Sequence, residues 1–256
     1  MFITLKLKLK LIIPLVCILL VGFSAIAIHN ISPEAVQVDA AVEQHTYKVY
    51  LTFDDGPSKN TEKALDTLKK HNVQGTFFVI GQTGDYELSL YRRIIDEGHA
   101  LGLHSYTHKT KKIYASAADY IADFERLRDW IFESTGTSPK FCRMVGGSKS
   151  SLCSTAARTQ IVEYFSSNGY ACYDWDIDPC DSCSYTLAAD AIADNVIRAA
   201  KKKPNQDLVI LMHDDVLRKT LPGALDIIIP YFKEQGYELG VLGADTELIG
   251  SRAVVK

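Results

Sequence analysis

Residues 47–57 read YKVYLTFDDGP, an alternating apolar segment that ends in two adjacent carboxylates. Its apolar residues recur at every second position up to Phe53, which predicts a strand over residues 47–53. A helical pattern follows over residues 60–71, and residues 75–80 form a second short apolar run. Strand, helix and strand in this order predict two parallel strands joined by a helical crossover.

The same rhythm continues along the chain. Further strands are predicted over residues 98–103, 141–145, 170–175, 207–212 and 237–242. Further helices are predicted over residues 86–97, 116–135, 152–168, 186–203 and 220–235. Strands that alternate with helices in this way pack into a parallel sheet with the helices outside it. The pattern therefore predicts one α/β domain, either an open sheet or a barrel.

The composition is that of a globular protein. Of the 256 residues, 47% are hydrophobic and 23% are charged, which excludes a mostly disordered chain. The 28 lysines and arginines are outnumbered by 31 aspartates and glutamates, which gives a formal net charge of −3. Such a charge balance does not favour general nucleic-acid binding. We predict no nucleic-acid partner and no protein partner.

The N-terminal segment has the features of a secretion signal. Lys6, Lys8 and Lys10 precede an uncharged apolar run over residues 11–28. The secretion machinery recognises such a run, which is also long enough to remain in the membrane as an anchor. The predicted parts of the chain are a signal peptide or membrane anchor, a linker, a folded domain and a tail, over residues 1–28, 29–46, 47–245 and 246–256. In either case, the folded domain is expected to work outside the cytoplasm.

Chemically reactive side chains lie on or near the ends of the predicted strands. They are Asp54, Asp55, His104, His108, Arg143, Asp174 and His213. The carboxyl ends of parallel strands lie at one edge of an open sheet or at one rim of a barrel. Residues far apart in the sequence are therefore expected to meet in one place.

The acidic pair and the histidine pair together indicate a metal site. Asp54 and Asp55 precede Gly-Pro, which alone is typical of a turn, but here an apolar strand leads into them. One carboxylate can then bind a metal while the other reaches a water on that metal. His104 and His108 are four residues apart, so on a helical turn both imidazoles would face one ion. The alternative is that the spacing arose by chance and that both histidines lie on the solvated surface. Two histidines and one carboxylate leave coordination positions open, as a catalytic zinc site requires.

Three further residues are candidates for acid–base chemistry. His213 ends the most apolar strand, where it is either an acid–base group or a capping histidine. Asp174, beside Trp175, is either a loop residue or a buried carboxylate that orients His213 and raises its pKa. Arg143 is either solvated or paired with Asp54, which it would hold in the ionised form.

Five short segments of the sequence, taken in chain order, resemble the motifs of the polysaccharide deacetylases, a family also called carbohydrate esterase family 4 or the NodB homology domain. The matching segments are TFDDGP at 52–57, HSYTH at 104–108, RMVGGS at 143–148, DW at 174–175 and LMH at 211–213. The resemblance covers residues 47–245 and implies a distorted (β/α)7 barrel with parallel strands and outer helices. It also implies a metal-dependent hydrolase that removes the N-acetyl group from N-acetylglucosamine units of a cell-wall polysaccharide. The sequence is most similar to the bacterial peptidoglycan N-acetylglucosamine deacetylases.

The resemblance also implies a role for each matching residue. Asp55, His104 and His108 would bind one divalent metal ion, with zinc expected and Co²⁺, Ni²⁺ or Fe²⁺ as alternatives. Asp54 would be the base that takes a proton from the water on the metal, and Arg143 would orient Asp54.

The leaving group and the acetyl group would be handled by the later segments. His213 would protonate the leaving sugar amine, with Asp174 tuning its pKa. The substrate-binding positions would be Trp175 and Leu211 at the acetyl pocket, and a backbone N–H near Val145 or Gly146 at the oxyanion.

The third segment departs from the family pattern. Its arginine is usually followed by an aromatic residue and a proline, and residues 143–148 contain neither. The backbone that should supply the oxyanion donor is then less fixed. This departure supports an alternative from another class, a catalytically weak glycan-binding barrel. Within the enzyme class, the alternatives are a chitooligosaccharide deacetylase and an acetyl xylan esterase, since the same chemistry hydrolyses esters.

Five cysteines cluster in the second half of the chain, at Cys142, Cys153, Cys172, Cys180 and Cys183. Disulfides are expected outside the cytoplasm. Cys180 and Cys183 lie in the loop after the fifth predicted strand, and we predict a disulfide that staples this loop. A redox site or a second metal site is the alternative.

Overall fold

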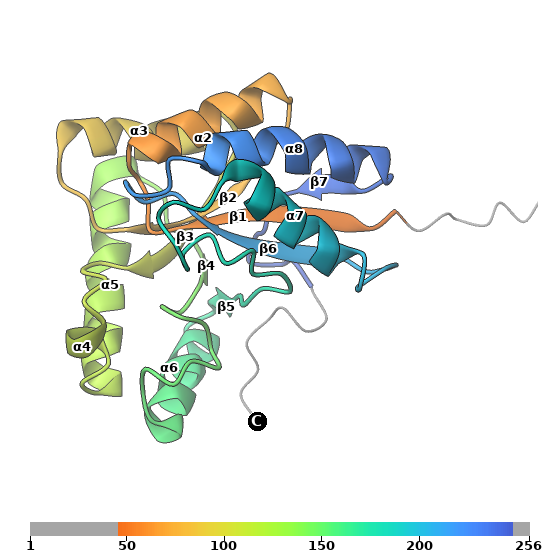
Figure 1. Ribbon diagram of the computed structural model, residues 1–256. Helices are drawn as coiled ribbons and strands as arrows, with labels where there is room; N and C mark the ends of the chain where they lie inside the picture. The colour runs from red at the N-terminus through yellow and green to blue at the C-terminus, as the bar shows by residue number, and fades with distance from the viewer. Residues whose placement is uncertain (1–45, 248–256) are drawn as a thin grey trace, which may run out of the picture. The chain divides into compact units, whose positions relative to one another are not determined.

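Seven parallel strands form one sheet within residues 46–247, the part of the chain that this computed structural model describes (Figure 1). They are β1 (Lys48–Asp54), β2 (Thr76–Ile80), β3 (Ala100–Ser105), β4 (Phe141–Cys142), β5 (Ala171–Cys172), β6 (Leu208–His213) and β7 (Glu238–Gly240). Their order across the sheet is β5-β4-β3-β2-β1-β6, and β7 pairs with the start of β1. The predicted parallel α/β architecture is confirmed.

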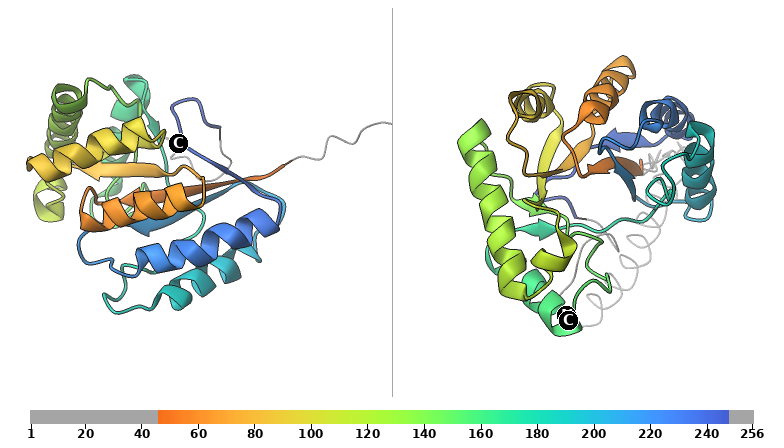
Figure 2. Two further views of the ribbon diagram at one scale, coloured as in Figure 1. Left: turned by 90° about the horizontal axis from the view of Figure 1, so that it is seen from above. Right: turned by 60° about the vertical axis from the view of Figure 1, so that its left-hand side comes forward.

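Helices cover the outside of this sheet. They are α2 (Lys59–Lys70), α3 (Asp85–Asp96), α4 (Thr110–Ile113), α5 (Ala117–Thr135), α6 (Thr155–Ser167), α7 (Ala189–Ala200) and α8 (Leu221–Glu234). In the right-hand view of Figure 2, α5, α3, α2, α8 and α7 stand in an arc around the strands. Most helices begin and end within a few residues of the predicted positions.

The ends of α5 show how local sequence sets an element. Ser116 precedes the helix, and its hydroxyl accepts a hydrogen bond from the N–H of Asp119. Such a cap satisfies one of the N–H groups that the first helical turn leaves free. Gly136 ends the helix in the left-handed conformation, with φ of 74°. The predicted limits of this helix are confirmed.

The barrel is distorted on the side of β4 and β5, which have two residues each instead of the five or six predicted. Directly after β5, the carbonyl groups of Tyr173 and Asp174 accept hydrogen bonds from the side chain of Arg143. Beyond β5, a single bridge joins Ile177 to Ile210 of β6. The sheet therefore curls into a distorted barrel and is not an open sheet.

Side chains of the strands alternate between two apolar cores. In β1, Val49, Leu51 and Phe53 pack in the large core between sheet and helices, whereas Tyr50 lies in a smaller cluster inside the barrel. Successive side chains of a strand point to opposite faces. Asp54 at the end of β1 therefore shares the inner face with Tyr50. The alternation thus directs the last residue of this strand into the barrel.

The predicted signal peptide or anchor lies outside the described residues, as do nearly all of the predicted linker and tail. Within residues 46–247, no helix is long and apolar enough to cross a membrane.

Candidate active site

Three strands bring polar side chains to the inside of the barrel at their carboxyl ends. Asp54 is the last residue of β1, His213 is the last residue of β6, and His104 is next to last in β3. Asp54 and His213 are directly paired across the neighbouring strands. The side chains of Asp54 and His104 are buried, and that of His213 is 15% exposed. The strand order therefore brings these distant residues together at one rim.

Asp55, His104 and His108 converge as a candidate metal site. Nε2 of His108 lies 3.0 Å from Oδ1 of Asp55, and Nε2 of His104 lies 3.4 Å from the same oxygen. The three ligand atoms all lie within 4.8 Å of one another. Donors at about 2 Å from a tetrahedral ion are roughly 3.4 Å apart, so these separations suit a small cation. Although burial alone would raise it, the two imidazoles hold the pKa of Asp55 well below its ordinary value.

Two of these three residues adopt an unusual backbone conformation. Asp55 has φ of 76° and His108 has φ of 52°, both in the left-handed region. Residues other than glycine adopt this region at a cost, and such residues are enriched at functional sites. The expected helical turn at residues 104–108 does not form, because His104 belongs to β3 and His108 lies in the loop before α4. The two imidazoles nevertheless stack, with ring centroids 5.4 Å apart.

The loop that carries His108 is folded around one carboxylate, that of Asp123 on α5. The hydroxyl of Ser105 and the N–H of Tyr106 donate to Oδ2 of Asp123, at 2.6 and 2.7 Å. The N–H and hydroxyl of Thr107 donate to Oδ1, at 3.1 and 2.7 Å. Sequence reasoning did not identify Asp123, whose only local signal is its place on the polar side of an amphipathic helix.

Arg143 is fully buried and every part of its guanidinium is used. Nη1 donates to Oδ1 of Asp54 at 2.8 Å and to the hydroxyl of Thr52 at 2.7 Å. Nε and Nη2 donate to the carbonyl oxygens of Tyr173 and Asp174, each at 3.1 Å. The alternative of a solvated arginine is therefore wrong, and the pair with Asp54 is present.

The backbone of Arg143 contributes to the site as well. Its carbonyl oxygen accepts a hydrogen bond from Nδ1 of His104 at 2.8 Å. This bond leaves Nε2 of His104 free to face Asp55, because a bond at one ring nitrogen orients the other.

His213 is held by Asp181, a residue that sequence reasoning missed. Nδ1 of His213 donates to Oδ1 of Asp181 at 2.9 Å, and the N–H of His213 donates to Oδ2 at 2.8 Å. Burial alone would lower the pKa of His213, but the bond to Asp181 and the charges of Asp54 and Asp55 raise it to about 9. The prediction that Asp174 orients His213 is wrong. The carboxylate in the stapled loop after β5 was an available signal, since that loop was expected beside the rim.

Asp174 instead anchors the third segment. Its carboxylate accepts hydrogen bonds from the N–H of Ser148, at 2.7 Å, and from the Ser148 hydroxyl. Gly147 has φ of 80°, and a Cβ there would lie 2.9 Å from the ring of Trp175. A glycine therefore allows this loop to pass close to the indole. The loop that lacks the family's proline is fixed by these contacts.

The candidate oxyanion donors differ in what they already bind. The N–H of Val145 donates to the hydroxyl of Tyr120 at 3.2 Å, whereas Gly146 is exposed. Of the two, Gly146 is therefore the better placed to donate to a ligand. Leu211 is buried, with its N–H bound to the carbonyl of Ile177 at 2.9 Å. The acetyl pocket of Trp175 and Leu211 stays a prediction.

The predicted staple is confirmed, because Cys180 and Cys183 form a disulfide. The other three cysteines within residues 46–247 are free, with Cys142 and Cys172 buried and Cys153 partly exposed. The disulfide thus lies in the same loop as Asp181.

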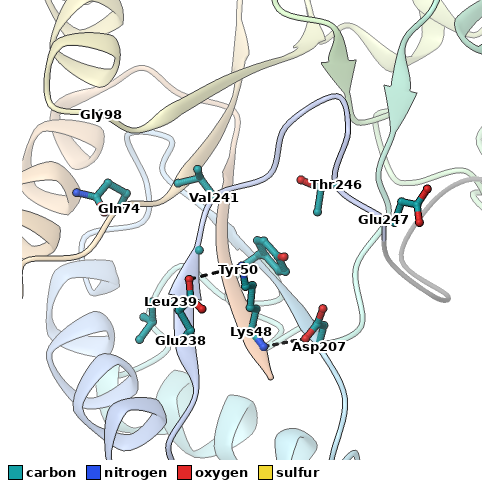
Figure 3. Close-up of a pocket in the computed structure, with 11 residues that line it drawn as sticks. Lys48, Tyr50, Gln74, Gly98, Asp207, Glu238, Leu239, Val241, Thr246 and Glu247 are labelled. Carbon is teal, nitrogen blue, oxygen red and sulfur yellow. Dashed lines mark hydrogen bonds and ion pairs between the residues drawn. The ribbon is translucent and has the colours of Figure 1, made fainter. Parts of the chain in front are cut away.

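A pocket of about 590 Å³ lies at the opposite end of the barrel (Figure 3). Lys48 at the start of β1, Glu238 at the start of β7 and Asp207 just before β6 line it. The N–H of Lys48 donates to Asp207 at 2.8 Å, and its ammonium lies 3.5 Å from Glu238. Because these residues mark the amino ends of the strands, the pocket is separate from the rim that carries Asp54 and His213.

Comparison with known proteins points to one family. A family model described as polysaccharide deacetylase matches residues 41–164. A peptidoglycan-N-acetylglucosamine deacetylase of Bacillus cereus is 38% identical over 193 residues, which cover 74% of this chain and 67% of that protein. The peptidoglycan-N-acetylglucosamine deacetylase PgdA of Listeria monocytogenes is 33% identical over 210 residues, which cover 80% of this chain but 40% of that protein.

The fold has a similar match among solved structures. The catalytic domain of peptidoglycan N-acetylglucosamine deacetylase from Eubacterium rectale superposes with a TM-score of 0.75 at 29% identity. The match covers 84% of this chain and 96% of that domain. The similarity therefore extends over nearly the whole of that solved domain, whereas the chain spans about two thirds of one curated relative and 40% of the other.

Proposed function

The chain belongs to the polysaccharide deacetylase family, and on that premise we propose that it hydrolyses the N-acetyl group of N-acetylglucosamine units in peptidoglycan, releasing acetate. The observation that carries the proposal is the division of labour between two adjacent carboxylates. Asp55 faces His104 and His108, whereas Asp54 is held by Arg143. One carboxylate can therefore join a metal site while the other remains available for a proton.

Asp55, His104 and His108 are the residues that would hold a divalent metal ion, and we expect zinc. One carboxylate oxygen and two imidazole nitrogens are donors that zinc takes in catalytic sites. Oδ1 of Asp55 is buried without a hydrogen-bond partner among the described residues, which fits a ligand atom. When bound there, the ion supplies Lewis-acid polarisation of the acetyl carbonyl and of the attacking water.

Asp54 acts as the general base. Arg143 binds Oδ1 of Asp54 at 2.8 Å, and Oδ2 lies on the side of His104, 4.0 Å from its Nε2. The buried guanidinium holds the orientation of this carboxylate. Oδ2 then accepts a proton from the water that attacks the acetyl carbon.

His213 acts as the general acid. Because its pKa is raised to about 9, the imidazole carries a proton at neutral pH. Asp181 occupies Nδ1, so Nε2 is the atom that donates to the sugar nitrogen as the C–N bond breaks. Gly146 is an exposed residue, and its N–H is the backbone donor that we assign to the oxyanion.

The experiment measures acetate release by the full chain from peptidoglycan, chitooligomers and acetylated xylan in parallel. We expect release that a chelator abolishes and zinc restores, and we expect it to be fastest from peptidoglycan. Faster acetate release from chitooligomers or xylan would show that one of those glycans, and not peptidoglycan, is the preferred substrate. Bound zinc without acetate from any of the three would overturn the enzyme assignment in favour of a glycan-binding barrel.

We also propose that the reaction takes place outside the cytoplasm, where peptidoglycan lies. The uncharged run over residues 11–28 supports this location. Cell fractionation tests it: activity in the membrane fraction indicates a retained anchor, activity in the medium indicates cleavage, and activity confined to the cytoplasm would contradict the proposal.

A further inference from the structure

The loop between β5 and α7 carries both the carboxylate that holds His213 and the disulfide. Asp181 is the residue after Cys180 and lies inside the four-residue turn that the disulfide closes. The Cα atoms of Cys180 and Cys183 are 5.1 Å apart, and the N–H of Cys183 donates to the carbonyl of Cys180 at 3.0 Å. The crosslink therefore encloses the partner of the general acid.

Asp181 accepts two hydrogen bonds from His213. One carboxylate oxygen accepts from the ring and the other accepts from the backbone N–H, so both the position and the rotation of the imidazole are defined. The Asp181 side chain is 2% exposed, so water does not easily replace it. Catalytic geometry at His213 thus depends on where this turn places Asp181.

The turn itself has little regular structure to hold it. No helix or strand lies between the end of β5 and the start of α7, which is Ala189. Cys180 adopts the left-handed region, with φ of 61°, and its N–H donates to Asp178 at 2.7 Å. A residue other than glycine resists this conformation, so the crosslink retains a backbone that the free chain disfavours.

Two contacts from neighbouring elements complete the support. The side chain of Asn195 on α7 donates to the carbonyl of Pro179 at 2.8 Å. Arg218 donates to the carbonyl of Asp181 at 3.2 Å, and to Asp215 at 2.9 Å. These bonds hold backbone carbonyls, and the disulfide is the covalent part of the support.

We propose that the Cys180–Cys183 disulfide is a positioning element for catalysis, which fixes Asp181 so that His213 protonates the leaving amine. The proposal rests on the proposed function. If the disulfide only stabilises the fold, its loss would change stability and would affect equally the attack on the acetyl carbon and the departure of the leaving group. A positioning disulfide affects the step in which the leaving group takes a proton.

The leaving group of the substrate separates these two roles. A sugar amine must be protonated to leave, whereas 4-nitrophenolate leaves from 4-nitrophenyl acetate as a stable anion. We compare the full chain with Cys183→Ser, which removes the crosslink but keeps Cys180 in place. Cys153→Ser is the matched control, since Cys153 is a free cysteine in another loop. All proteins are zinc-loaded, and bound zinc and Tm are measured for each.

We expect Cys183→Ser to lower kcat on the acetylated glycan by about 10-fold to 100-fold, because misplacing an acid–base group lowers the rate by roughly this factor. We expect less than about threefold change on 4-nitrophenyl acetate, whose leaving group needs no acid. Cys153→Ser should match the parent on both substrates.

The pH profile gives a second readout. Losing the hydrogen bond to Asp181 lowers the pKa of His213, while the charges of Asp54, at the end of β1, and of Asp55, directly after it, remain. The alkaline limb of kcat on the glycan should therefore move to lower pH in Cys183→Ser. An unchanged limb together with equal losses on both substrates would overturn the proposal and leave a structural staple.

Reduction of the parent protein covers the case in which the variant fails to fold. Dithiothreitol gives up two electrons and two protons: its thiolate attacks one sulfur, the Cys180–Cys183 bond breaks, and a cyclic disulfide leaves. We expect a reversible loss on the glycan alone, with bound zinc unchanged. Hydrolysis of 4-nitrophenyl acetate by the same reduced sample is the control for metal stripping, because loss of zinc would lower both activities.

The outcomes separate the two proposals. A parent protein that hydrolyses 4-nitrophenyl acetate but releases no acetate from any glycan contradicts the proposed function. A parent protein active on the glycan, with Cys183→Ser or the reduced parent equally active, contradicts the positioning role alone.

Discussion

Arg143 concentrates several functions in one side chain. It binds Thr52, Asp54 and the carbonyl oxygens of Tyr173 and Asp174 while fully buried. Removing one partner of such a buried ion pair costs about 3–5 kcal/mol, because the other charge is left without a partner. A variant at Arg143 would therefore lose stability and orientation together. The catalytic assignments are better tested at Asp54 itself.

Asp54→Asn should lower kcat for acetate release by at least about 100-fold, because an amide cannot take the proton from water. Its oxygen still accepts from Arg143, so bound zinc should stay at the parent level. His104→Ala is the contrasting variant and should lose the ion. Acetate release and metal content of the same samples check this, and normal turnover in Asp54→Asn would show that another group is the base.

Gly56 is a position where a side chain has no room. A Cβ there would lie 2.3 Å from Oδ2 of Asp214, whose buried carboxyl also binds Thr61. We expect Gly56→Ala to lower the free energy of unfolding by about 1–3 kcal/mol, as overpacking does. Gly243→Ala is the control, since its nearest neighbour would be 3.9 Å away. Urea denaturation measures both, and equal midpoints would contradict the expected clash.

At the scale of elements, α5 shapes a loop that it does not belong to. Asp123 collects four hydrogen-bond donors from residues 105–107, between the two histidines. The i, i+4 spacing of the histidines predicted that both imidazoles face one site, and both do face Asp55, but the helical turn that it also predicted does not form at residues 104–108. A helix on the outside of the barrel replaces the hydrogen bonds that a helical turn would have made internally.

Asp123→Ala should weaken zinc binding by about 10-fold to 100-fold, the usual effect of losing a residue that orients metal ligands. The partly exposed loop can bind water instead, so the fold should persist. Asp129→Ala is the matched control on the same helix, since within residues 46–247 the Asp129 carboxylate is hydrogen-bonded to the neighbouring Arg128. Chelator competition measures the affinity. Unchanged affinity in Asp123→Ala would mean that the barrel alone fixes His108.

At the scale of the whole molecule, the alternation of strand side chains places apolar core residues on one face of the sheet and the polar side chains of the candidate site on the other. The outer face of the strands joins the helices in the large core, and the inner face ends in Asp54, His104 and His213. Parallel strands place these ends together at one rim, away from the pocket of Figure 3. Stability should therefore respond to pH through groups outside the rim as well.

His99 is such a group. It is 7% exposed between α3 and β3, and its Nδ1 accepts the N–H of Gly75 at 3.0 Å. Burial lowers the pKa of His99 to about 4, against an ordinary value of 6.5. Between pH 6.5 and pH 4, His99 is therefore protonated in the unfolded chain and neutral in the folded chain. Stability from this residue is complete above pH 6.5 and falls as the pH drops through that window, by up to about 3 kcal/mol.

His99→Gln should remove this contribution. The free energy of unfolding is measured by urea denaturation from pH 8 to pH 4.5 for both proteins. At pH 8 the variant is expected to be the less stable, and towards pH 4.5 the difference should shrink or reverse. Parallel curves over the whole range would show that His99 does not titrate differently on folding.

Local patterns were sufficient for the order of strands and helices, for the parallel class of the sheet and for the residues that could bind a metal. Period-2 apolar runs and helical stripes are properties of neighbouring residues, so they are visible in the sequence. The family segments at 52–57 and 104–108 added the substrate class. The disulfide between Cys180 and Cys183 was also predictable from their spacing in one loop.

The hydrogen-bond partners of the candidate catalytic groups were decided only in the folded chain. Asp181 reaches His213 across 32 residues, and Asp123 reaches the histidine loop from another element. Asp174, which stands beside an apolar strand as His213 does, binds Ser148 instead. A side chain's hydrogen-bond partner depends on loop paths and burial in three dimensions, and neighbouring residues carry no record of either.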